Sequence, residues 1–159
     1  MLSVFDGLRD VTTLSVFVRL ACALICGGII GIERSYKRRP AGFRTHILIC
    51  IGAAITTLTS QYLYLNMHYF TDMARLGAQV VAGIGFIGAG TIIVTKRQRV
   101  KGLTTAAGLW TSAIIGLTFG GGFYEGGILA TVFIMLAELV FSRIEYRVLE
   151  NVPEINLYM

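Results

Sequence analysis

Charged residues are scarce in this chain. Asp, Glu, Lys and Arg make up only 14% of its 159 residues, whereas soluble domains contain roughly a quarter. Hydrophobic residues make up 55% and fall in long runs. This composition excludes an ordinary water-soluble domain and indicates one domain surrounded mostly by lipid.

The net charge of +5 does not indicate a nucleic-acid-binding protein. The cationic residues form short clusters between apolar runs instead of a basic face. We therefore expect the lipid bilayer, and no nucleic acid, as a partner. Clusters of this kind set the orientation of a membrane protein.

The chain also lacks the motifs of disulfide-rich proteins and of enzymes. Its three cysteines lie in apolar runs, and their odd number gives no disulfide framework. Cys22 and Cys26 share one helix face, where we favour packing residues over metal ligands. We find no zinc-protease, nucleotide-loop or serine-elbow motif and predict that the protein is not an enzyme.

Five apolar runs are candidates for membrane spans. They cover about residues 11–32, 45–65, 76–95, 103–119 and 126–141. The third run is free of charge over about 20 residues, which spans a ~30 Å hydrocarbon core at ~1.5 Å per residue. The predicted fold class is all-α: a polytopic transmembrane bundle of five spans.

The connections between these runs differ in charge. Most of the 14 Lys and Arg residues lie in segments 34–44, 96–101 and 143–147, and the other two connections hold none. The positive-inside rule then predicts an outer N-terminus and a cytoplasmic C-terminus. The expected parts are an extracytoplasmic segment at 1–10, a five-helix transmembrane domain at 11–142 and a cytoplasmic tail at 143–159.

A weak internal repeat relates the first two spans to the third and fourth. The matched positions include Gly28 with Gly88, Lys37 with Arg97, Gly42 with Gly102, and Thr45 with Thr105. Each half reads as a glycine-bearing helix, a basic loop and a second helix. We interpret this as a parallel repeat about the membrane normal, with chance similarity as an equal alternative.

Small residues recur every four positions on several spans. The stripes are Ala23, Gly27 and Gly31; Gly52, Thr56 and Ser60; and Gly108, Ser112, Gly116 and Gly120. Such stripes let helices approach closely where lipid removes the hydrophobic driving force. They predict close packing within the monomer, and we expect a homodimer in addition.

Ionisable residues within the spans are candidates for function, because charge in hydrocarbon is costly. Arg19 is expected to snorkel outward, towards the level of Asp72. Glu138 falls near the cytoplasmic layer of Glu33, Arg34 and Arg44. A structural salt bridge is the favoured interpretation there.

The third span carries Gly83, Gly85, Gly88 and Gly90 near its middle. A tight packing face is the favoured interpretation of this cluster. The alternative is a discontinuous helix whose freed carbonyl groups bind a cation. Gln79 adds a polar group one turn into the same span.

The start of the fourth span is polar. Thr104 and Thr105 are expected to cap this helix, or to line a polar pocket with Arg44 and Thr45. Trp110 lies too deep for an interfacial anchor, so we expect it to be packed inside the bundle.

Three motifs together resemble the MgtC/SapB family of bacterial membrane proteins. They are GIIGIER at 28–34, PAGFRTH at 40–46, and AQVVAGIGFIGAG at 78–90 followed by GLTTAAGLW at 102–110. The resemblance covers about residues 20–140. It implies a multi-pass plasma-membrane protein linked to magnesium homeostasis and, in pathogens, to virulence through survival inside host cells.

Two features set this chain apart from the family pattern. Many members carry a soluble C-terminal domain, and too few residues follow Arg147 here to form one. Thr111 stands where virulence-type members have Cys, so the virulence role is not carried over directly. The motif positions and Glu138 form the candidate site set: Glu33, Arg34, Arg44, Thr45, Asp72, Arg75, Gln79, Gly85, Gly88, Thr104, Thr105, Trp110 and Glu138.

Two functional hypotheses follow. In the first, the protein acts in magnesium homeostasis and binds or passes Mg²⁺, with Glu33 and Asp72 as oxygen ligands at the two membrane faces. In the second, it is a regulatory protein whose helix faces dock on another membrane complex, such as the ATP synthase that the resemblance suggests.

Overall fold

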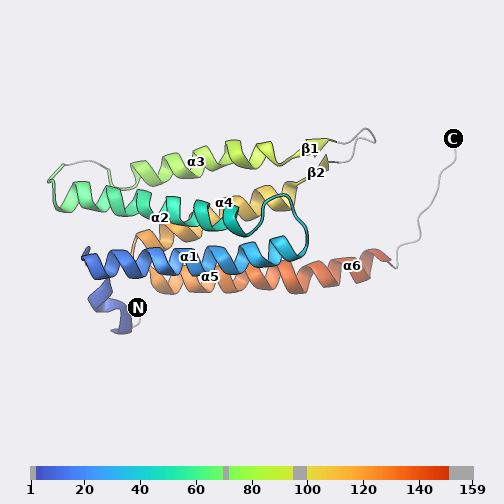
Figure 1. The fold of residues 1–159 in the computed structure, drawn as a ribbon, viewed down its shortest axis with the longest axis horizontal. Helices are drawn as coiled ribbons and strands as arrows, with labels where there is room; N and C mark the ends of the chain where they lie inside the picture. Colours follow the sequence, from blue (N-terminus) through green and yellow to red (C-terminus); the bar gives the residue numbers. More distant parts are fainter. Residues whose placement is uncertain (1–2, 70–71, 95–99, 151–159) are drawn as a thin grey trace.

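The computed structural model describes residues 3–69, 72–94 and 100–150, and the side chains of 145, 146, 149 and 150 are not described. Its elements are η1 (Ser3–Leu8), α1 (Thr13–Tyr36), α2 (Phe43–Leu65), α3 (Arg75–Gly90), β1 (Ile93–Val94), β2 (Val100–Lys101), α4 (Leu103–Gly120), α5 (Tyr124–Leu136), the π-helical turn η2 (Ala137–Phe141) and α6 (Ser142–Glu150) (Figure 1). The predicted all-α bundle is confirmed.

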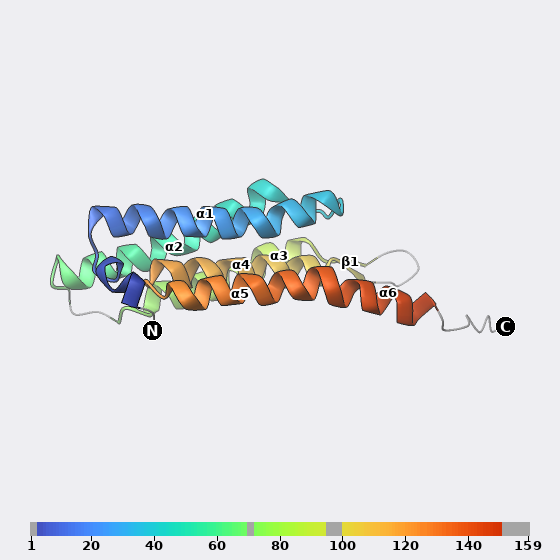
Figure 2. The same ribbon diagram turned by 90° about the horizontal axis from the view of Figure 1, so that it is seen from below.

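The helices α1 to α5 run along one common axis (Figures 1 and 2). Among the described residues, four helices are long and apolar enough to cross a membrane: α1, α2, α4 and the continuous helix Tyr124–Ile144. Helix α3 is apolar but has 16 residues, shorter than the predicted span. The orientation in the membrane and the internal repeat stay predictions.

Successive helices from α1 to α5 are antiparallel, and α6 continues the direction of α5, so the connections gather at two ends of the bundle (Figure 1). One end holds η1 and the α2–α3 and α4–α5 connections. The other holds the α1–α2 loop, the β1–β2 hairpin and α6; we call it the basic end because Lys37, Arg38, Arg39, Arg44 and Lys101 lie there. The predicted loop cations Lys96, Arg97 and Arg99 lie outside the described residues.

Helix α2 is the centre of the bundle, since both α1 and α4 pack closely against it. A side chain at Gly27 would meet Cys50 Cβ at 2.9 Å, and one at Gly116 would meet Ala53 Cβ at 2.8 Å. The small residues of α1 and α4 are therefore used within the monomer, as predicted. The homodimer stays a prediction.

Helix α3 lies at the edge of the bundle and contacts mainly α4. It is α-helical without a break from Arg75 to Gly90, so the discontinuous-helix alternative is wrong. Gly88 packs against Ala106 at 3.4 Å, whereas Gly83, Gly85 and Gly90 face open space within the described structure. The predicted packing face thus consists of one glycine of the four.

The end of α3 differs from the prediction for a geometric reason. Residues 93–94, expected in the third span, pair as a β-strand with residues 100–101, Ile93 opposite Lys101. Gly102 then starts α4 with φ 97°, where a side chain would collide with the Thr91 carbonyl. Glycine alone adopts this left-handed geometry without strain.

Candidate functional site

A buried ion network lies at the basic end of the bundle. It consists of Glu33, Arg34 and Lys37 at the end of α1, His46 in the first turn of α2, Thr105 in the first turn of α4, and Glu138 in η2. Four segments that are far apart in the sequence meet here. We refer to these six residues as the ion network.

Arg34 is the centre of the network and its side chain is 1% exposed. Its Nη1 donates to Glu138 Oε2 at 2.7 Å, and its Nη2 donates to Thr105 Oγ1 at 3.1 Å. The guanidinium therefore joins α1 to both α4 and the last helix. This confirms the expected salt bridge of Glu138 and gives Arg34 as its partner.

Thr105 takes a role that differs from helix capping. Helix α4 begins at Leu103, its N-cap residue Gly102 provides no side-chain cap, and the Thr105 hydroxyl accepts from Arg34 instead. Thr104 is exposed on the first turn. The capping prediction for this pair is wrong, because the buried cation nearby competes for the hydroxyl of Thr105.

The π-helical turn at Ala137–Phe141 positions Glu138. A π turn is rare and often found at functional sites, since it alters the helix phase and disturbs the backbone hydrogen bonds. Lys37 Nζ donates to the Glu138 carbonyl at 2.6 Å and also lies 2.7 Å from Glu33 Oε1. One lysine thus links a buried carboxylate to the backbone of the last helix.

His46 is fully buried beside these charges. Its Nδ1 lies 2.9 Å from the Gly42 carbonyl and donates to it, which leaves Nε2 as an acceptor in the neutral ring. Glu33, Arg34 and Glu138 are the charged groups near enough to interact electrostatically with the imidazole ring. Gly108 on α4 leaves room opposite, since a side chain there would lie 3.6 Å from Nε2.

Three buried polar atoms of the network have neither a hydrogen-bond nor an ion-pair partner among the described residues: Glu33 Oε2, Arg34 Nε and His46 Nε2. Buried polar atoms are nearly always satisfied, so such a group marks a place where water, an ion or a proton has a role. The two carboxylates balance the two cations, which limits the cost of burying them in a low-dielectric bundle.

The structure brings together Glu33, Arg34, Thr105 and Glu138 of the predicted site set. Arg44 and Thr45 lie at the same end but outside the network, Arg44 being exposed and Thr45 half-buried. Sequence reasoning missed His46 and Lys37 as site residues. The sequence held a signal for both, because Lys37 lies three residues after the motif at 28–34 and His46 is the last residue of the motif at 40–46.

The predicted residues of the opposite end do not form a cluster. Asp72, Arg75 and Gln79 are exposed, and Asp72 Oδ1 accepts a hydrogen bond from the Ala74 amide at 2.9 Å. Asp72 therefore holds the turn that leads into α3, whose N-cap residue Ala74 makes no side-chain cap. Its predicted role as a metal ligand, like that of Glu33, stays a prediction.

Trp110 corrects another expectation. It is 45% exposed on the outer side of α4 instead of packed within the bundle. Hydropathy places it deep in a span but does not give the direction in which the side chain points. Gly85 is likewise exposed, whereas Gly88 is buried.

A second buried cation lies at the other end, where Arg19 is completely buried. Its Nη1 donates to Gln61 Oε1 at 2.7 Å and to the Gly120 carbonyl at 2.8 Å, and its Nη2 donates to the Arg9 carbonyl at 2.6 Å. The predicted outward snorkelling towards Asp72 is wrong. Carbonyl groups at the ends of η1 and α4 bind the two Nη atoms inside the protein, whereas Arg19 Nε has no hydrogen-bond partner among the described residues.

Within residues 3–69, 72–94 and 100–150, no three His, Cys, Asp or Glu side chains lie close enough together to hold a metal ion. Coordination by Glu33 would therefore use few protein ligands and several waters. That mode is usual for Mg²⁺.

Comparison with known proteins identifies relatives. The MgtC family profile matches residues 20–147. "Putative magnesium transporter YhiD" of Escherichia coli K12 is 42% identical over 143 residues, covering 87% of this chain and 66% of the relative. "Protein MgtC" of Salmonella typhimurium is 37% identical over 131 residues, covering 82% and 54%.

These relatives are longer than the chain. It spans about two thirds of YhiD and about half of MgtC. An uncharacterized protein of Haemophilus influenzae is 40% identical over 129 residues and is also matched over 54% of its length. No solved structure gives a significant match.

Proposed function

The chain belongs to the MgtC family, and on that premise we propose that it is a bacterial membrane protein of magnesium homeostasis in which Mg²⁺ acts at Glu33. One observation carries the proposal. The Glu33 carboxylate is 7% exposed, with one oxygen 2.7 Å from Lys37 and the other without a hydrogen-bond partner in the described structure.

The chemistry of this carboxylate suits a hard cation. Mg²⁺ prefers carboxylate oxygens and keeps several of its waters, so one or two acidic groups suffice to hold it. A divalent ion at Glu33 competes with the Lys37 ammonium. Because Lys37 also binds the Glu138 carbonyl at 2.6 Å, its displacement loosens the link between α1 and the last helix. The bundle would then respond to magnesium.

The test uses cells that lack their own copy and depend on this chain for growth in limiting magnesium. We expect Glu33→Gln to abolish the response, because the neutral amide binds Mg²⁺ poorly. Glu125→Gln is the matched control, since Glu125 is paired with Arg9 at 2.7 Å at the opposite end. Equal behaviour of the two variants would contradict a role for Glu33.

Flux measurements distinguish transport of Mg²⁺ from a change in the protein on binding Mg²⁺. Purified protein in liposomes with a magnesium indicator inside reports whether Mg²⁺ passes. Asp72→Asn is informative here, because the asparagine side-chain oxygen still accepts a hydrogen bond from the Ala74 amide while the charge is removed. Suppose that no flux is seen, and that Mg²⁺ raises the thermal stability of the wild type but not that of Glu33→Gln. This outcome would exclude transport and support a role in sensing Mg²⁺.

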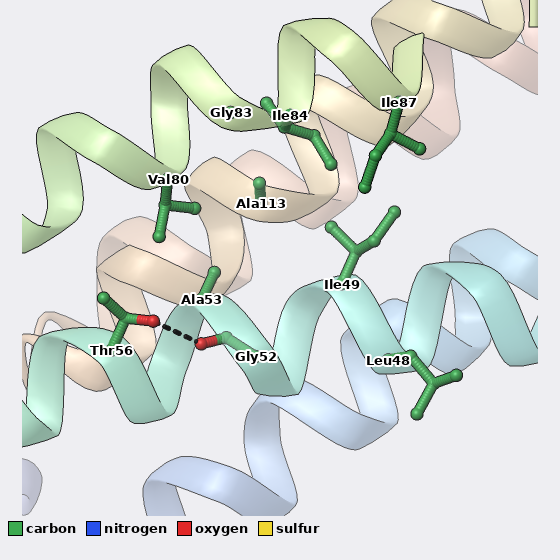
Figure 3. A pocket seen from close by; sticks show the side chains of 10 residues that line it. All are labelled: Leu48, Ile49, Gly52, Ala53, Thr56, Val80, Gly83, Ile84, Ile87 and Ala113. Carbon is green, nitrogen blue, oxygen red and sulfur yellow. Dashed lines mark hydrogen bonds between the residues drawn. The ribbon is translucent and has the colours of Figure 1, made fainter. Parts of the chain in front are cut away.

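A second candidate function is regulation through contact with another membrane complex, such as ATP synthase. A groove of about 360 Å³ between α2 and α3 favours it, because the two helices contact each other little there. Figure 3 shows Ile49 of α2 facing Ile84 and Ile87 of α3 across the groove, whereas Leu48 points away from α3. Its walls are apolar and include the small residues Gly52, Ala53 and Gly83.

A photoreactive residue at position 87 tests this second function in native membranes, with position 129 on the exposed face of α5 as the control. A regulatory contact predicts a cross-link to another polypeptide from position 87 and none from 129. Cross-links between copies of this chain alone would argue for the homodimer and against the regulatory contact.

A further inference from the structure

A second cavity at the basic end is separate from the interior of the ion network. It has a volume of about 360 Å³ and is lined by Lys37, Arg39, Ser142, Arg143 and Arg147. Four of these five side chains are cationic, and they come from the α1–α2 region and from α6. We call this cavity the basic pocket.

The arginines of the basic pocket differ in how they are engaged. Arg39 and Arg143 are exposed, and neither guanidinium has a hydrogen-bond partner in the described part of the chain. Arg147 already takes part in another interaction, and Lys37 binds Glu33 and Glu138. The pocket thus offers two guanidinium groups that suit a phosphate, which arginine binds with paired N–H donors.

An apolar groove of about 270 Å³ lies next to α1 and the last helix, at residues that precede those of the basic pocket in both segments. Ile29 of α1 lines one side, and Met135, Leu136, Leu139 and Val140 line the other. The last helix lines both hollows, with Leu136 and Val140 in the apolar groove and Arg143 and Arg147 in the basic pocket. Its lining changes from apolar to cationic between Val140 and Arg143.

We propose that the basic pocket and this groove together bind one anionic phospholipid. Its phosphate lies between Arg39 and Arg143, and an acyl chain lies along Leu136 and Val140. Basic pockets between transmembrane helices on the cytoplasmic side recognise anionic headgroups, and this pocket lies at the end that the positive-inside rule places in the cytoplasm. This site differs from scattered arginines at a membrane surface, because its cationic pocket and its apolar groove are lined by neighbouring parts of the same helix.

This inference does not depend on the proposed magnesium function. The two meet at Lys37, which lines the basic pocket and is bound to Glu33 in the ion network. A lipid phosphate near Lys37 would weaken its hold on Glu33. Lipid binding and occupation of Glu33 are therefore expected to favour each other.

The test is native mass spectrometry of the full chain with phosphatidylglycerol or phosphatidylcholine added at equal concentration. We expect preferential retention of phosphatidylglycerol. The double variant R39Q/R143Q should weaken it by about fivefold for each guanidinium removed. R44Q/R75Q is the matched control, since it removes the same charge from exposed positions outside the pocket and should leave retention unchanged.

The acyl chain is tested separately. Val140→Trp fills the groove without changing charge and should lower phosphatidylglycerol retention, whereas Leu129→Trp on the exposed face of α5 should not. The proposal is overturned if both lipids are retained equally, or if R39Q/R143Q behaves like R44Q/R75Q. It is also overturned if inorganic phosphate binds as tightly as the lipid and Val140→Trp has no effect, because the pocket then takes a soluble anion.

Discussion

The Arg34 guanidinium on α1 donates to the Glu138 carboxylate in the π-helical turn at 2.7 Å, and both side chains are largely buried. This ion pair joins the first long helix to the last across the basic end. Its partners are 104 positions apart in the sequence. It is the contact on which the arrangement of the ion network depends.

Removing one partner of this pair should be far more damaging than removing both. Glu138→Leu leaves the buried Arg34 charge unpaired, and we expect a loss of about 3–5 kcal/mol in the free energy of unfolding. The double variant Arg34→Met with Glu138→Leu should recover much of that loss. Chemical denaturation in detergent measures both. If the double variant is as unstable as the sum of the single variants, the two side chains act independently.

Arg19 should tolerate no other cation. Lysine keeps the charge but has one compact ammonium, which is unable to serve Gln61, Gly120 and Arg9 from their three directions. We expect Arg19→Lys to release η1 from the bundle, seen as faster amide exchange in residues 3–10. Arg44→Lys changes an exposed arginine and should leave that exchange unaltered. Unchanged protection of residues 3–10 in Arg19→Lys would show that other contacts hold the segment.

Two glycine substitutions should differ in outcome although both lie in long helices. A Cβ at Gly116 would collide with the Cys50 carbonyl and lie 2.8 Å from Ala53 Cβ, so Gly116→Ala should cost about 1–3 kcal/mol. Gly85 faces open space in the described structure, and Gly85→Ala should be neutral or stabilise by up to about 1 kcal/mol. Thermal denaturation in detergent distinguishes them. A functional loss in Gly85→Ala without a loss of stability would favour the regulatory function.

Labelling of engineered cysteines tests the orientation in the membrane, after Cys22, Cys26 and Cys50 have been replaced by alanine. Cysteines at positions 39 and 101 should be protected from an impermeant maleimide in intact cells, because both belong to the basic end. A cysteine at Asn66, at the other end, should react. Reaction of 39 and 101 on different faces would contradict both the predicted orientation and the shared end seen in the structure.

Much of the fold was predictable because its signals are local. Hydropathy marks apolar runs whatever packs against them, and four of the five predicted spans correspond to helices long enough to cross a membrane. The third did not, because β1–β2 pairing and the left-handed geometry of Gly102 draw residues 93–94 out of the helix. The pairing of two short strands leaves no mark on a hydropathy profile, because it depends on backbone geometry.

The candidate site was predictable in part for the same reason. Depth along a helix follows from position, so Glu138 was expected near the layer of Glu33 and Arg34, and it lies there. Rotation about the helix axis does not follow from depth. That is why Trp110 proved exposed, Arg19 proved buried and Lys37 was overlooked.

The sequence alone determined that lipid surrounds this chain and that its cations gather in three segments. Hydropathy and the positions of charges are read directly from the order of the residues and do not depend on tertiary contacts. Only the tertiary structure decided which charges meet. The depth of each helix, its rotation and the phase shift of one π-helical turn together place Arg34 against Glu138, and these depend on every contact in the bundle at once.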